Sequence, residues 1–283
     1  MGILYIILII VGVSAQSVLK KAYNNKSGGS GVFTFAAISS SAACLFFLVK
    51  SGFSFEFSPE IIPYALLFAL AYVLASVFNF LAIQCGPLSL TSLALSFSLL
   101  IPTFYGLIFD GDKISAWLIV GILFLVASMI LINLGKGETK ITLKWAIYAV
   151  IALVANGVCS TVQPVQTAIF ESRYDEVFMI IALACVSVSL FGLAFCFERR
   201  ETLPSLKGGW HFMVVCGLAN GAVNLFVMLA SVLVDKSVMF PLISAGGIVL
   251  TWLISVFLYK EKLALRQNVG MVLGVAAIVF LNL

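Results

Sequence analysis

Ten apolar runs, each close to twenty residues long, divide this chain from end to end. A helix rises about 1.5 Å per residue, so roughly 20 residues cross a hydrocarbon core of ~30 Å. The runs lie at about 2–22, 32–50, 60–84, 88–109, 114–134, 143–168, 176–197, 209–233, 237–258 and 264–283. Short polar connections separate them, and Gly86-Pro87 marks a tight one because proline does not easily continue a helix. The pattern predicts ten transmembrane helices.

The composition is that of an integral membrane protein. Hydrophobic residues make up 62% of the chain and charged residues only 10%, with a mean hydropathy of +1.17. Soluble domains are roughly one quarter charged, so this chain lacks the side chains for a water-facing surface. We expect an all-α, multi-pass membrane protein located in the bacterial inner membrane.

Two stretches of the sequence repeat each other. FDGDKISAWLIVGILFLVASMILINL at 109–134 aligns with LYKEKLALRQNVGMVLGVAAIVFLNL at 258–283, at a constant offset of 149. The shared positions include Lys113/Lys262, Gly121/Gly270 and Asn133/Asn282. Chance similarity between two apolar helices is the alternative. The match favours two five-helix repeats, 1–137 and 138–283, and because five is odd, the second repeat enters the membrane from the opposite side.

These residues resemble the ten-helix EamA-type branch of the drug/metabolite transporter superfamily. The resemblance rests on Pro102, Gly111-Asp112-Lys113 and Gly121 in the first half, and on Glu261-Lys262, Gln267 and Gly270 in the second. Three positions depart from the family pattern, which are Asp112, Lys260 and Thr251. The resemblance implies a transporter whose first, third, fourth, sixth, eighth and ninth helices line a central cavity.

Polar side chains recur at helical spacing within six of the predicted helices. Polar groups inside a membrane are costly, so their positions are informative. The candidate substrate-binding residues are Gln16, Tyr72, Ser76, Asn79, Ser96, Asn156, Ser160, Gln163, Asn220, Asn224 and Ser244. For single serines, a hydrogen bond to the same helix or to a neighbouring helix is the simpler interpretation. For the amides, the cavity and the packing interpretations are equally well supported.

No Asp, Glu, Lys or Arg lies in the middle of a predicted helix. A neutral polar cavity suits an uncharged or zwitterionic solute, such as an amino acid, and the absence of a mid-depth carboxylate argues against proton coupling. Helix breaks at Pro102, Pro164 and Pro241 could bind a carboxylate through helix ends. An exporter of lipophilic drug-like compounds and a non-transporting scaffold or assembly partner are the alternatives.

The sequence contains no HExxH, GxSxG or glycine-rich phosphate loop, and its six cysteines form no CxxC. We therefore expect no enzymatic activity, cofactor or metal site. The expected partners are a small-molecule substrate and membrane lipid, not nucleic acid.

Gly270 and Gly274 form a small-residue motif that would allow either a homodimer or a contact within the chain. The orientation is also open. Twelve of the sixteen Lys and Arg follow odd-numbered helices, which places both termini outside by the positive-inside rule, whereas the family resemblance implies cytosolic termini.

Overall fold

The structure is a computed structural model, and it describes all residues except 28–29, 86–90, 92–94, 96, 99, 112–114, 134–141, 259–264 and 282–283. Within the described part of the chain, every regular element is helical. The elements are α1 (Gly2–Ser27), α2 (Val32–Lys50), η1 (Pro59–Ile61), α3 (Ile62–Cys85), α5 (Leu100–Tyr105), η2 (Gly106–Asp110), α6 (Ala116–Asn133), α7 (Leu143–Ile169), α8 (Asp175–Phe197), α9 (Thr202–Ser231), α10 (Lys236–Leu258) and α11 (Leu265–Leu281).

Six of the described helices are long and apolar enough to cross a membrane, namely α1, α2, α3, α7, α8 and α9. Large apolar side chains such as Leu66, Leu70 and Val188 stay exposed on their outer faces. In water this exposure would be unfavourable, whereas in lipid it costs nothing. The predicted all-α membrane fold is thus confirmed, while the division into ten spans stays a prediction.

Two predicted connections are wrong in their bounds. The helix α9 begins at Thr202, so most of the polar stretch 198–209 is helical, and α1 continues to Ser27. Pro204 does not prevent this, because it lies in the first turn of α9, where a backbone N–H has no helical partner. In both helices, the apolar segment is therefore extended at one end by helical polar residues.

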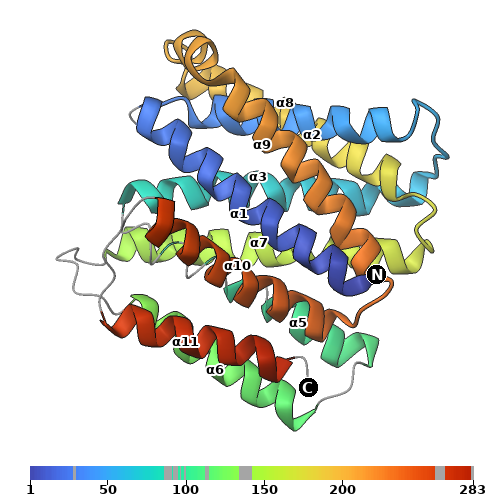
Figure 1. Cartoon of the computed structure of the whole chain (residues 1–283). Coiled ribbons are helices and arrows are strands. Elements are labelled where there is room, and N and C mark those ends of the chain that lie inside the picture. Colours follow the sequence, from blue (N-terminus) through green and yellow to red (C-terminus); the bar gives the residue numbers. More distant parts are fainter. Residues whose placement is uncertain are drawn as a thin grey trace.

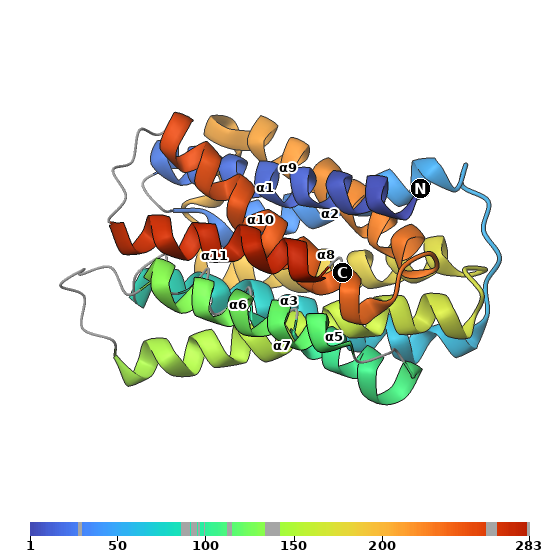
Figure 2. The ribbon, with the colours of Figure 1, turned by 60° about the horizontal axis from the view of Figure 1, so that its bottom comes forward.

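Helices of the first half pack mainly against helices of the second half. The helix α1 packs on α9, α2 on α8 and α9, α3 on α7 and α8, α5 on α10 and α7, and α6 on α11. Figures 1 and 2 show α6 and α11 side by side at one edge of the bundle, next to α10. Each half therefore buries its apolar surface against the other half.

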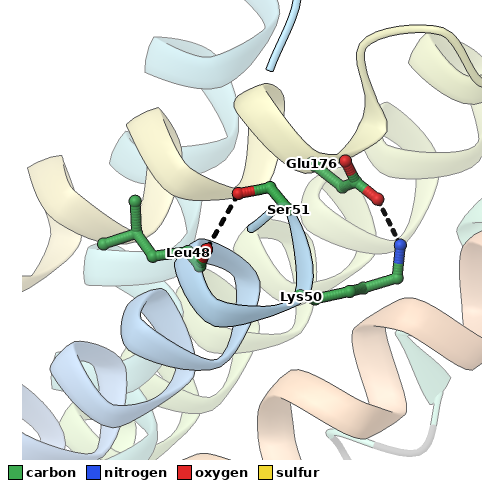
Figure 3. Close-up of polar contacts among 4 residues, drawn as sticks. All are labelled: Leu48, Lys50, Ser51 and Glu176. Atoms are coloured by element: carbon green, nitrogen blue, oxygen red, sulfur yellow. Dashed lines mark hydrogen bonds and ion pairs between the residues drawn. The ribbon is translucent and has the colours of Figure 1, made fainter. Parts of the chain in front are cut away.

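The packed pairs run in opposite directions. Gly2 at the start of α1 lies against Leu233 and Val234, just beyond the end of α9, whereas Tyr23 near the end of α1 lies against Gly209 near the start of α9. In the same way, Lys50 at the end of α2 forms an ion pair with Glu176 in the first turn of α8 (Figure 3).

The largest core cluster joins both halves. Phe47 of α2, Phe68 of α3 and Phe178 of α8 are almost completely buried. Phe68 and Phe178 meet edge to face, with their ring centroids 5.5 Å apart. Lipid is as apolar as these rings, so the cluster is stabilised by close packing and not by removal from water. This cluster holds α2, α3, α7 and α8 together around their shared contacts.

The start of α2 is capped by a carboxylate from another helix. Glu198, at the end of α8, accepts hydrogen bonds from the backbone N–H groups of Val32 (2.7 Å), Phe33 (2.9 Å) and Thr34 (2.9 Å), and from the Thr34 hydroxyl (3.0 Å). Gly31, which precedes α2, has a left-handed backbone conformation and no side chain to cap the helix. The negative charge also faces the positive end of the α2 dipole. Glu198 thus joins the two halves at this membrane face.

Tyr23 closes the same junction from α1. Its hydroxyl donates to the carbonyl oxygens of Ser30 (3.0 Å) and Gly31 (3.3 Å) in the connection between α1 and α2. Burial raises the pKa of Tyr23 above its ordinary value. The hydroxyl therefore stays protonated, and remains a donor, over the physiological pH range.

We predict that Glu198→Ala destabilises the protein by about 2–3 kcal/mol, because three N–H groups of α2 lose a charged acceptor in a buried position. Thermal unfolding of the detergent-purified protein measures the effect. Glu201→Ala is the matched control, since Glu201 is exposed three residues further on. Equal melting temperatures for the two variants would contradict this role of Glu198.

Candidate functional site

Four of the predicted site residues form one hydrogen-bonded chain. The Asn220 side-chain amide donates to Gln16 Oε1 at 3.2 Å. The Asn224 amide donates to Asn220 Oδ1 at 3.0 Å and to its carbonyl oxygen at 2.9 Å. The Gln163 amide donates to the Asn224 carbonyl oxygen at 2.8 Å. We call these four residues, from α1, α7 and α9, the amide network.

Helix geometry explains why these side chains meet. Asn220 and Asn224 are four residues apart, so they lie on one face of α9. Glycines 12, 217 and 221 bring neighbouring chain close to α9, as a Cβ at each would lie within 3 Å of another residue. Gln16, Gln163 and Asn224 are buried, and a buried amide without a partner costs free energy. The network gives these buried amides some of the hydrogen-bond partners that they need, and all of those partners are neutral groups.

Tyr72 of α3 adds an aromatic wall to the amide network. Asn220 lies beside the Tyr72 hydroxyl, and the Tyr72 ring lies 5.9 Å from that of Phe68, centroid to centroid. Tyr72 is deep in the protein but only half-buried, as is Asn220. Both residues therefore keep some accessible surface.

Asn156 makes a second polar contact about two turns before Gln163 on α7. Its amide donates to the Ser98 hydroxyl at 2.6 Å. Ser160, the next residue on this face, is half-buried. Pro164 lacks a backbone N–H, so the Ser160 carbonyl loses its ordinary helical donor. This carbonyl adds an acceptor between Asn156 and Gln163.

The other predicted site residues lie apart from the network or outside the described structure. Asn79 is half-buried, and its Oδ1 has no hydrogen-bond partner among the described residues. Ser76 is half-buried on the same helix, and Ser244 is buried in α10. Ser96 lies outside the described residues, as do Asp112, Lys113, Glu261 and Lys262 of the repeated turns. The expectation that all these side chains face one cavity stays a prediction.

The two hollows described in the structure lie elsewhere. One, of about 300 Å³, is purely apolar and lies between α5, η2 and α6, with Phe104, Leu118 and Leu123 among its lining residues. The other, of about 250 Å³, lies near Tyr23, Lys26 and Ser205. Neither contains a predicted site residue, and the amides of the network are paired with one another instead.

The prolines within helices and the glycine motif both have predicted roles. The helices α7 and α10 continue through Pro164 and Pro241, so the expected breaks there are wrong. Neighbouring helices hold both segments in place despite the lost hydrogen bonds. Gly270 and Gly274 are buried against α6, where Ser128 donates to the Gly270 carbonyl. Of the two predicted uses of these glycines, the structure shows the contact within the chain. A homodimer through them stays a prediction.

Sequence reasoning missed three polar residues that the structure makes prominent. Glu198 lies in the charged run ERRE, which reads as a loop, although the lack of a capping side chain before α2 is a signal for an outside acceptor. Gln166 and Asp175 sit at the end of α7 and the start of α8. Gln166 is three residues beyond Gln163, so helical spacing could have included it.

Comparison with known proteins identifies the family. The EamA-like transporter family matches residues 143–283, the second half of the chain from the first residue of α7 to its end. The chain belongs to the EamA-like transporter family. This confirms the family resemblance of the sequence, and it makes the chain a multi-pass membrane protein of a transporter family.

A solved structure shares the fold of this EamA-like transporter. Its title reads only "Crystal structure of protein", and it is similar with a TM-score of 0.74 at 13% sequence identity, covering 99% of this chain and 95% of that chain. At such low identity the similarity shows the fold alone. No curated protein matches the chain.

A double-mutant cycle tests the amide network of this EamA-like transporter. We expect Gln16→Ala and Asn220→Ala to be non-additive in unfolding free energy by about 1 kcal/mol, because they share one buried hydrogen bond. Gln16→Ala combined with Ser189→Ala is the control, since exposed Ser189 bonds only within α8. Full additivity of both pairs would show that Gln16 and Asn220 do not interact in the folded protein.

Proposed function

We propose that this EamA-like transporter moves a small uncharged or zwitterionic polar metabolite, for example an amino acid, by alternating access. The observation that carries the proposal is the amide network beside Tyr72. Neutral donors and acceptors suit a polar solute without net charge, and an aromatic ring suits its apolar part.

The proposal also explains why the network contains no ion pair. A hydrogen bond between neutral groups contributes only about 0.5–1.5 kcal/mol, so a solute can replace it and later leave. Breaking a buried ion pair costs more, about 3–5 kcal/mol. In the proposed cycle the solute takes over bonds that the four amides make with one another, and the amides pair again after its release.

Alternating access follows if the two halves are inverted repeats. The contact of α1 with α9 has its counterpart in the contact of α7 with α3, when each helix is exchanged for its equivalent in the other half. Equivalent helices α2 and α8 run in opposite directions, and so do α6 and α11, where Trp117 stacks on Phe280. Both observations support an inverted repeat of 1–137 and 138–283 about the amide network.

An experimental structure provides the test of this symmetry. We expect helices of the first half to superimpose on those of the second after a rotation of about 180° about an axis in the membrane plane. If only a rotation about the membrane normal overlays them, the repeats are parallel and the inverted arrangement is wrong.

Single cysteines test the site. In a variant without native cysteines, we expect Tyr72→Cys, Gln163→Cys and Asn220→Cys to react with a membrane-impermeant thiol reagent. A pool of amino acids, nucleosides or sugars that contains the substrate should slow this reaction, because the bound solute covers the same atoms.

Two control positions show how the reagent reacts with a water-exposed cysteine and with a lipid-exposed cysteine. Ser54→Cys, in the exposed connection after α2, should react at once, and Val188→Cys, exposed to lipid on α8, should not react. If Ser54→Cys reacts while all three site variants stay unreactive in a folded protein, the amides are packing contacts and the proposed site is wrong.

A further inference from the structure

A second polar cluster lies where α7 ends and α8 begins. The Thr167 hydroxyl donates to Asp175 Oδ1 at 2.9 Å. Gln166 lies beside the same carboxylate, but without the geometry of a hydrogen bond. Gln166 and Thr167 are almost completely buried, whereas Asp175 is half-buried, so part of its surface stays accessible from outside the protein.

Gln166 is the unusual member of this cluster. Within the described part of the chain, neither its amide nitrogen nor its amide oxygen has a hydrogen-bond partner. Leaving such a group buried and unpaired costs about 1–3 kcal/mol. An apolar residue would fill this position at lower cost, so the amide calls for a partner that is present only part of the time.

The connection between the two helices holds the carboxylate over the last turn of α7. Glu171 and Ser172 both have left-handed backbone conformations, with φ of 49° and 63°. The Ser172 N–H bonds the Thr167 carbonyl at 2.9 Å, and the Phe170 N–H bonds the Gln166 carbonyl at 3.1 Å. These bonds use the backbone of Gln166 and leave its side chain to face Asp175.

The charges around Asp175 oppose a metal cation. Glu176 follows it on α8, and Lys50 approaches from the end of α2, and these two side chains pair with each other (Figure 3). Arg173, in the connection, pairs with exposed Glu56. Asp175, Gln166 and Thr167 together supply four side-chain oxygens, fewer than the roughly six to eight that Ca²⁺ takes, whereas a proton needs only one carboxylate and one acceptor.

We propose that Asp175, Gln166 and Thr167 form a proton-binding site. At this membrane face an O–H bond of hydronium breaks and leaves water, and the proton forms one O–H bond on the Asp175 carboxylate. The neutral acid then donates to Gln166 Oε1, whereas the ionised carboxylate accepts from Gln166 Nε2. One amide can therefore form a hydrogen bond with either charge state of Asp175, by rotating so that Oε1 and Nε2 exchange places.

The site could couple protons to transport, a role that rests on the proposed function. Gln166 is one turn beyond Gln163 of the amide network, on the same helix. Pro164, between them, removes one helical hydrogen bond and makes this turn easier to deform. A change in the Asp175 charge would thus reach the amide network along α7. The carboxylate lies at the start of α8 and not at mid-depth of a helix.

Selective labelling measures the proton directly. The chain has four aspartates, Asp110, Asp112, Asp175 and Asp235. Carbon-13 labelling of aspartate carboxyl groups, followed by NMR of the purified protein against pH, gives a titration for each, and Asp175→Asn identifies the Asp175 signal. Exposed Asp235 is the internal reference.

We expect Gln166→Leu and Thr167→Val each to move the Asp175 midpoint to higher pH by about one unit, a tenfold change in proton affinity. Thr167→Val removes a donor to the ionised carboxylate. Gln166→Leu removes a bond from both charge states, but the bond to the ionised carboxylate is the stronger one because its acceptor is charged. In both variants the acid therefore keeps its proton to higher pH. Thr161→Val is the matched control on α7, since Thr161 bonds only the Gly157 carbonyl of its own helix. The Asp175 midpoint should not move in this variant.

Two outcomes would overturn the proposal. Asp175 could titrate together with Asp235, or its midpoint could stay unchanged in both Gln166→Leu and Thr167→Val. These measurements need no substrate, so their failure is distinct from failure of the proposed transport function. Every thiol reacts faster as it ionises, so the exposed Ser54→Cys thiol gives the ordinary pH dependence of the reaction. For coupling, the ratio of the Asn220→Cys rate to the Ser54→Cys rate should change with pH, and this change should be lost when Asp175→Asn is added. A ratio that does not change with pH would overturn the coupling role.

Discussion

The structure depends on one constraint, which is that polar groups in a hydrocarbon environment must find partners inside the protein. Lipid does not drive apolar helices together as water does, so packing and polar contacts between helices must hold them in place. In this chain those contacts run between the halves. Glu198 of α8 caps α2, Gln163 of α7 reaches α9, and Asn220 of α9 reaches α1.

The same constraint separates rigid contacts from movable ones. Glu198 combines a full charge with four donors, so the start of α2 is held firmly to α8. The amide network uses only neutral groups, which are side-chain amides and the backbone carbonyls of Asn220 and Asn224. A transporter needs both kinds of contact, because the two halves must stay together while the groups that meet the solute exchange partners.

The cluster around Asp175 differs from both. Its carboxylate keeps one firm partner, Thr167, while the neighbouring Gln166 amide is buried without one. An amide can donate or accept, so it tolerates a change of charge that a purely apolar or purely charged neighbour would oppose. This is the physical reason why the end of α7 is suited to respond to protons, whereas the junction at Glu198 is suited to stay closed.

The sequence by itself determined the membrane environment, the all-helical class and the family. Ten apolar runs and a 10% charged composition leave no soluble alternative, and the paired motifs around Gly121 and Gly270 indicated EamA-type transporters. Helical spacing also placed Asn220 and Asn224 on one face, because that spacing is a local property of a helix. It could not show that Gln16 and Gln163 are their neighbours. Those contacts join residues up to 204 positions apart, and only the packing of the two halves decides them. Tertiary structure likewise decided that Glu198 is a cap and that the glycines of α11 face α6, since each depends on which helix lies opposite.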